Sequence, residues 1–136
     1  MDQAAHRERF ASARVAHLAT VDDDGRPHLV PVVFALEGNT IYFAVDQKPK
    51  KTTRLQRLRN IASNPAVAML VDHYEDDWEK LWWVRADGVA RVLDPGDIAD
   101  HALALLTQRY MQYAAQPPPG PVVAITVEKW SGWSAG

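Results

Sequence analysis

Turn-forming residues cut the first third of this sequence into short apolar runs, and this spacing limits the possible fold more than any other feature. Val15 to Val21 is a compact apolar run, and Asp22 to Pro27 has turn chemistry, because Asp and Gly tolerate tight turns and Pro breaks strand pairing. A second strand is predicted from His28 to Leu36, followed by a turn at Glu37 to Asn39 and a third strand from Thr40 to Val45. We therefore expect the first 45 residues to form an antiparallel meander.

The rest of the chain alternates between helical spacing and extended runs. Helices are predicted at Asp2 to Ala13, Lys50 to Ala62 and Asp97 to Tyr110; strands at Val67 to Val71, Leu81 to Leu93 (the longest) and Val122 to Trp130; and an extended connector at Pro117 to Pro121. Six strands with hairpin connections in 136 residues indicate one domain, residues 1–136, that is mainly β: a six-stranded antiparallel β-barrel, closed or half-open, with α-helices at intervals.

Two of these elements carry side-chain predictions. In the strand from Leu81 to Leu93, Trp83, Arg85 and Asp87 should share one face, and Trp82, Val84 and Ala86 the other, because a strand has a period of two. In the helix from Asp97 to Tyr110, the expected apolar residues are Ile98, Leu103, Leu105 and Leu106.

Composition removes several function classes. The chain has no cysteine, which excludes disulfides, thiol nucleophiles and thiolate metal sites and favours a cytoplasmic location. Ser131 lacks the first glycine of a G-x-S-x-G nucleophile elbow, and the five histidines show no metal-ligand spacing, so no metal site is expected. No apolar run is long enough for a signal peptide or a membrane span. No residue is assigned as catalytic.

A basic segment runs from Lys48 to Arg59 and holds six of the fifteen basic residues and no acidic residue, although the formal net charge of the chain is −2. So compact a cluster suits one bound polyanion better than a nucleic acid, which needs a wider basic face. Lys48, Lys50, Lys51, Thr52 and Thr53 stand where the predicted helix begins, and free N–H groups at a helix start favour phosphate. The alternative is a solvated basic surface helix.

Five tryptophans are many for a chain of this size. Trp82 and Trp83 are adjacent in one predicted strand, so they must point to opposite faces. One can fill the core, and the other either packs there as well or lines a planar-ligand or dimer surface.

The order of these features is similar to that of a known family. The residues that carry the likeness are Val15-Ala16-His17-Leu18-Ala19-Thr20-Val21 with Asp24-Gly25-Arg26-Pro27, Ile41-Tyr42-Phe43-Ala44-Val45, Lys48-Pro49-Lys50, Asn60-Ile61-Ala62-Ser63-Asn64-Pro65, Val67-Ala68-Met69-Leu70-Val71 and Leu81-Trp82-Trp83-Val84-Arg85-Ala86-Asp87-Gly88. With them the chain resembles the pyridoxamine 5′-phosphate oxidase-like split-barrel superfamily, and within it the class of coenzyme F420-dependent oxidoreductases, which bind a deazaflavin.

This resemblance implies a six-stranded split barrel of the FMN-binding type that forms a homodimer, with the cofactor in a groove between the subunits. It implies a phosphate site at Lys48, Lys50, Lys51, Thr52 and Thr53, and a ring lying along the second strand at Val30, Pro31, Val32 and Val33. Alignment from the strand places the main phosphate ligand at Lys50, whereas alignment from Asn64-Pro65 places it at Arg57. We favour Lys50, because phosphate prefers the helix start, and assign Arg54 and Arg57 to the outer charges of the ligand.

Trp83 takes the place next to a polar cofactor-contacting residue of the oxidases, and the oxidases' C-terminal Trp and Arg pattern is not evident, since only Ser134, Ala135 and Gly136 follow Trp133. Both departures argue against production of pyridoxal phosphate. The leading hypothesis is a homodimer that transfers hydride from reduced coenzyme F420 to a small unsaturated or quinone-like acceptor. The alternatives are an FMN-dependent reductase or oxidase, and a non-catalytic binding module for deazaflavin, flavin or haem.

Overall fold

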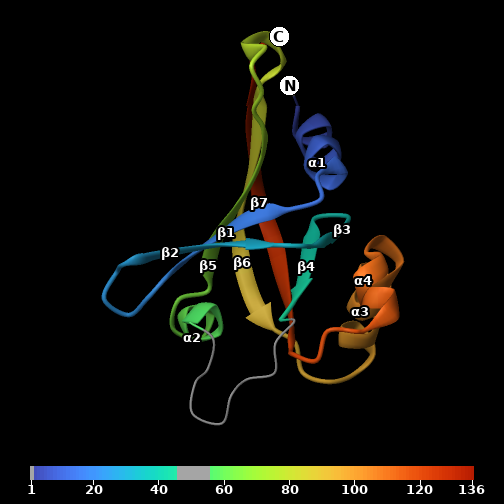
Figure 1. Ribbon diagram of the computed structural model, residues 1–136. Coiled ribbons are helices and arrows are strands. Elements are labelled where there is room, and N and C mark those ends of the chain that lie inside the picture. The colour runs from blue at the N-terminus through green and yellow to red at the C-terminus, as the bar shows by residue number, and fades with distance from the viewer. Residues whose placement is uncertain (1, 46–55) are drawn as a thin grey trace.

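The computed structural model describes residues 2–45 and 56–136, and these form one antiparallel sheet with helices around it (Figure 1). The strands are β1 (Ala16–Val21), β2 (Pro27–Val32), β3 (Ala35–Glu37), β4 (Thr40–Ala44), β5 (Ala66–His73), β6 (Trp82–Val92) and β7 (Val122–Ser134). Their order in the sheet is β2-β1-β5-β6-β7-β4-β3. The mainly β barrel is thus confirmed, with seven strands in the described chain where six were predicted.

The additional strand arises because the expected run from His28 to Leu36 is divided into β2 and β3 at Val33 and Phe34. The hydroxyl of Tyr110 accepts a hydrogen bond from the Phe34 N–H at 3.0 Å and lies 2.8 Å from the Phe34 carbonyl oxygen. Because a side chain satisfies these backbone groups, they do not enter a strand ladder. The predicted meander is therefore wrong at this point: β2 pairs with β1, and β3 pairs with β4.

This division curls the sheet. β2 and β3 stand at opposite ends of the strand order, yet only two residues separate them along the chain. The two ends of the sheet must therefore lie close together, which encloses an apolar interior. Its largest fully buried side chains include Phe10, Phe34, Phe43, Leu18, Met69 and Ile125.

Four α-helices lie around the sheet in the described chain. They are α1 (Gln3–Ser12), α2 (Gln56–Ser63), α3 (Asp97–Arg109) and α4 (Met111–Ala115), and a short 3-10 helix, η1 (Trp78–Lys80), connects β5 to β6. The start of the helix predicted at Lys50 to Ala62 lies outside the described residues, and α2 accounts for the rest. Helix α4 was not predicted, because five residues are too few to establish a helical period.

Helix α1 begins where its sequence predicts, since the Asp2 side chain caps it by accepting a hydrogen bond from the Ala5 N–H at 2.8 Å. In α3 the buried residues are Ala99, Ala102 and Leu106. Of the apolar residues named from the sequence, Leu106 is therefore buried, whereas Ile98 is exposed. Small residues face the sheet here because a helix with alanines on its inner side can approach closely.

β5, β6 and the end of β7 continue beyond the barrel as an arm, and α1 lies along it (Figure 1). β7 is the longer strand, with 13 residues against 11 in β6, which corrects the prediction that the strand from Leu81 to Leu93 is the longest. The strand predicted to end at Trp130 continues to Ser134, and it passes through Gly132, where a Cβ would lie 2.5 Å from Nδ1 of the His6 side chain. Close packing of α1 therefore explains the glycine.

No helix in residues 2–45 and 56–136 combines the length and the apolar character needed to cross a membrane.

Candidate functional site

The outer face of the barrel has two halves. One half, formed by Ala35, Tyr42, Ala44, Val122 and Ala124, is packed under α3 and α4, and we call it the covered half. The uncovered half carries the outward-facing residues of β1, β2, β5 and β6, among them His17, Leu29, Pro31, Leu70, Trp83 and Arg85. The predicted faces of β6 are confirmed, because Val84 and Ala86 are buried while Trp83, Arg85 and Asp87 are not. The uncovered half is where the described chain offers open sheet to a ligand or partner.

A hollow of about 700 Å³ lies on the uncovered half, and we call it the face pocket. It is lined by His17, Ala19, Leu29, Ala68, Met69, Leu70, Asp72, Tyr74, Trp83 and Arg85. The guanidinium of Arg85 stands 5.9 Å from the ring centre of Trp83, and its Nε donates to Asp87 at 3.1 Å. The pocket thus combines an aromatic wall with a cation whose charge is partly balanced.

A second hollow, of about 270 Å³, lies where β2 passes toward β3, and we call it the edge pocket. Its lining residues are Val15, Pro31, Val32, Val33, Ala44, Arg57 and Tyr113. Pro31 points to the outside of the barrel and Val32 to its core, so the cavity follows the edge of β2 rather than one face. The Nε of Arg57 is buried and has no hydrogen-bond partner among the described residues. A buried guanidinium nitrogen without a partner is a ready donor for an anion.

The two pockets adjoin. His17 of the face pocket is directly opposite Pro31 of the edge pocket in the β1–β2 ladder. Directly opposed side chains have Cβ atoms about 4.5–5.5 Å apart. A flat ligand that lies along β2 could therefore reach both hollows.

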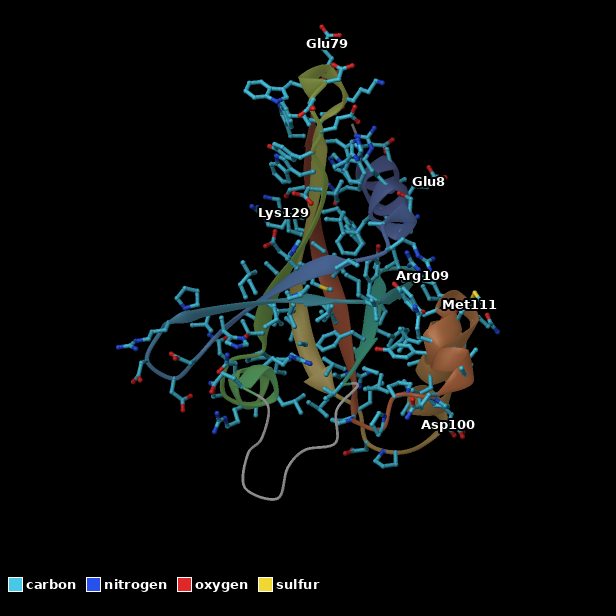
Figure 2. The ribbon with its side chains drawn as sticks, viewed as in Figure 1. Glu8, Glu79, Asp100, Arg109, Met111 and Lys129 are labelled. Atoms are coloured by element: carbon cyan, nitrogen blue, oxygen red, sulfur yellow. The ribbon has the colours of Figure 1, made fainter. Side chains whose placement is uncertain are left out.

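The C-terminal end of α3 holds the segment beside the edge pocket in place. The hydroxyl of Tyr110 reaches both backbone groups of Phe34 and lies 3.0 Å from the carbonyl oxygen of Arg14, which precedes Val15. The Arg109 guanidinium donates to the carbonyl oxygens of Ala11 and Ala13, and its side chain lies between α1 and α3 (Figure 2). Two walls of the pocket, at Val15 and Val33, are thus anchored to the same helix end.

Burial lowers the pKa of the Arg109 guanidinium, and the nearby Arg14 lowers it further, while Tyr110 acts in the opposite direction. Arg109 nevertheless keeps two carbonyl acceptors and stacks 4.7 Å from the centre of the Phe34 ring. This arginine serves the fold, and it does not line either pocket.

The predicted cofactor-binding residues are distributed as follows. Pro31, Val32, Val33 and Arg57 come together in the edge pocket, Trp83 lies in the face pocket, and Val30 packs against the barrel core. Lys48, Lys50, Lys51, Thr52, Thr53 and Arg54 lie outside the described residues. The alignment from Asn64-Pro65 placed the phosphate ligand at Arg57, and Arg57 lines the edge pocket. The alignment from the strand placed it at Lys50, which lies outside the described residues.

Several pocket residues escaped sequence reasoning, notably His17, Leu70 and Tyr113. His17 and Leu70 are opposite each other in the β1–β5 ladder, a register that depends on strands far apart in the sequence. Tyr113 belongs to the unpredicted α4. The period-two alternation of each strand was the available signal for His17 and Leu70, but it does not say which strands are neighbours. Across residues 2–45 and 56–136, no group of His, Asp or Glu is arranged to hold a metal ion.

Solved structures share this architecture over nearly the whole chain. An FAD-binding protein from Mesorhizobium loti matches with a TM-score of 0.75 and 21% identity, covering 97% of this chain and 92% of that one. A conserved hypothetical protein from Mycobacterium tuberculosis matches with a TM-score of 0.79 and 22% identity, covering 99% and 86%. The haem storage protein HutZ from Vibrio cholerae matches with a TM-score of 0.72 and 17% identity, covering 96% and 90%.

At these identities the likeness shows the fold, so the class of protein is a split β-barrel. A family model described as pyridoxamine 5′-phosphate oxidase matches residues 2–134, and the chain therefore belongs to the pyridoxamine 5′-phosphate oxidase family. No curated protein matches the chain.

Proposed function

We propose that this chain is one subunit of a homodimeric oxidoreductase that binds a flavin-type cofactor along the edge of β2. Coenzyme F420 is the first candidate and FMN the second. The observation that carries the proposal is the edge pocket, in which Pro31, Val32 and Val33 of the predicted ring-binding segment meet Arg57, whose Nε is buried. The FAD-binding protein of the same fold supports a flavin-type ligand.

The charge pattern favours coenzyme F420 over FMN. FMN needs one phosphate site, whereas the deazaflavin coenzyme adds a lactyl and oligoglutamate tail. Six basic residues between Lys48 and Arg59 suit the longer polyanion. Two of them, Arg57 and Arg59, belong to α2, and Arg57 lines the edge pocket.

The homodimer is supported by the uncovered half. Leu29 is 67% exposed and Trp133, which is opposite Trp83 in the β6–β7 ladder, is 45% exposed. Exposed apolar residues grouped on one face are typical of protein or ligand contacts. A second copy on this face would turn both open pockets into a groove between subunits, large enough for a ligand that one chain only partly encloses.

When bound, such a cofactor supplies the hydride chemistry, and the protein binds it, orients it and excludes water. Apart from Arg57, the edge pocket contains one titratable group among its described lining residues, Tyr113, which is buried. We therefore assign the proton that must accompany hydride transfer to solvent. The apolar lining of the face pocket favours a small, flat acceptor.

Ligand titration followed by tryptophan fluorescence tests the cofactor, because Trp83 lines the face pocket. We expect oxidised coenzyme F420 to bind more tightly than FMN. Tighter binding of FMN would transfer the proposal to the second candidate, and binding of neither would overturn it.

Arg57→Gln tests the anion site, and Arg59→Gln is the matched control, since Arg59 is exposed on the same helix. Loss of one charged hydrogen-bond donor should weaken cofactor binding roughly tenfold or more in Arg57→Gln and little in Arg59→Gln. Lys50→Gln, measured beside them, decides between the two alignments of the phosphate ligand. If all three variants bind the cofactor as tightly as the wild-type protein does, the phosphate assignment is refuted.

A carrier is the second candidate function, and the scarcity of acid–base groups in the edge pocket favours it. The haem storage protein of the same fold supports a binding role without turnover. Mixing the protein and reduced cofactor with a panel of quinone-like and unsaturated acceptors distinguishes the two functions. An enzyme accelerates oxidation of the cofactor, whereas a carrier leaves the rate unchanged or slows it.

A further inference from the structure

Two prolines shape the free edge of β2. In the β1–β2 ladder Pro27 is opposite Val21, Leu29 opposite Ala19, and Pro31 opposite His17. An antiparallel ladder alternates between pairs that exchange two hydrogen bonds and pairs that exchange none. Proline has no N–H to exchange, so these three pairs are the non-bonded ones, and their β2 members direct their backbone groups away from β1.

This edge is rich in acceptors and poor in donors. In the described chain β2 has β1 as its single neighbour, so the backbone groups that point away from β1 meet no other strand. The carbonyl groups of Pro27, Leu29 and Pro31 all face outward, but Leu29 alone of the three has an N–H. Pro31 lines the edge pocket, and at this edge its backbone presents a carbonyl oxygen and no amide donor.

The missing donor matters for a ring of the flavin type. The central ring of a flavin carries a nitrogen, N5, whose lone pair accepts a hydrogen bond in water. A 5-deazaflavin has a C–H group in that place and needs no donor. Burying a polar atom without a partner is unfavourable, whereas burying C–H is not.

We propose that Pro31 is a specificity-determining residue, which disfavours flavins and admits 5-deazaflavins by withholding a backbone donor at the β2 edge. The inference rests on the proposed function, because it requires the ring to lie along β2. The basic segment can favour the longer anionic tail of coenzyme F420, but it cannot distinguish the two ring systems, since FMN and 5-deaza-FMN carry the same phosphate; Pro31 can.

The test uses that pair of ligands, which differ only at position 5. We expect the wild-type protein to bind 5-deaza-FMN roughly tenfold more tightly than FMN. Equal binding of the two by the wild-type protein would overturn the inference and leave the proposed function standing. Failure of both to bind, and of coenzyme F420 to bind, would overturn the proposed function together with the inference.

The matched variants are Pro31→Ala and Pro27→Ala, which restore an N–H at the same free edge, the first inside the edge pocket and the second outside its lining. Pro31→Ala should gain affinity for FMN and keep its affinity for 5-deaza-FMN, so that the preference disappears. Pro27→Ala should keep the wild-type preference. If the two variants behave alike, Pro31 does not determine specificity.

Discussion

Helices α3 and α4 cover one half of the barrel's outer face, whereas the other half lies open in the described chain. The covered half is built from small residues and tyrosines, such as Ala44, Ala124 and Tyr42, with the side chain of Leu106 inserted from α3. The uncovered half carries Leu29, Leu70 and Trp83 around the face pocket of about 700 Å³. The same sheet therefore uses one outer half for its own stability and leaves apolar surface exposed on the other half, where we propose that a ligand and a second copy bind.

The largest effect should come from the covered half. Leu106→Ala removes a fully buried side chain and leaves a cavity between α3 and the sheet, so we expect a loss of about 2–5 kcal/mol in the free energy of unfolding. Chemical denaturation measures it. Leu29→Ala is the matched control on the uncovered half, and it should change the stability by less than about 0.5 kcal/mol. Equal losses would show that the two halves do not differ in their role.

Tyr110→Phe keeps the ring and removes the hydroxyl that serves Phe34 and Arg14. Because the Phe34 N–H then lacks its partner in a buried place, we expect a loss of about 1–3 kcal/mol in unfolding free energy. Tyr74→Phe, at an exposed tyrosine of the arm, should be nearly neutral. Retained stability in Tyr110→Phe would mean that the hydroxyl does not anchor the junction of β2 and β3.

Measuring self-association tests whether the uncovered half forms the dimer interface. Leu29→Glu places a charge where we propose that a second copy packs, so the dimer dissociation constant should rise at least roughly tenfold, a change of about 1.4 kcal/mol. Sedimentation velocity over a concentration series measures it. Ile98→Glu, at a similarly exposed residue on α3, should leave assembly unchanged. If Ile98→Glu weakens the dimer and Leu29→Glu does not, the interface lies on the covered half instead.

The smallest effect is expected at Ile98 itself. It is 53% exposed, so Ile98→Ala should change the unfolding free energy by less than about 0.5 kcal/mol. Ala102→Leu, on the buried side of the same helix, should destabilise by about 1–3 kcal/mol through overpacking. Thermal denaturation compares the two variants, and a larger loss of stability at Ile98 than at Ala102 would contradict the burial pattern of α3.

Sequence reasoning succeeded where the determining contacts are local. The start of α1 next to Asp2, the turn from Asp22 to Pro27 and the two faces of β6 follow from neighbours a few residues apart. Local reasoning did not show that Ile98 is exposed, because the helical period does not show which side of α3 faces the sheet. It also joined β2 to β3, because the partner that divides them, Tyr110, is 76 residues away from Phe34.

The candidate site divides in the same way. The family resemblance implied that Pro31, Val32, Val33 and Arg57 contact a cofactor, and the structure brings these four into one cavity. No local pattern could place His17 opposite Leu70, or Tyr113 beside Val15, because each pair joins segments that meet only after folding.

By itself the sequence determined most of the helices and strands and the two faces of β6, because side-chain period and turn chemistry act over a few residues. The order of its motifs indicated the family. The tertiary structure decided which half of the outer face is covered, where β2 ends, and that its proline-lined edge opens into a pocket. Those features depend on strand order and register, which arise from long-range pairing.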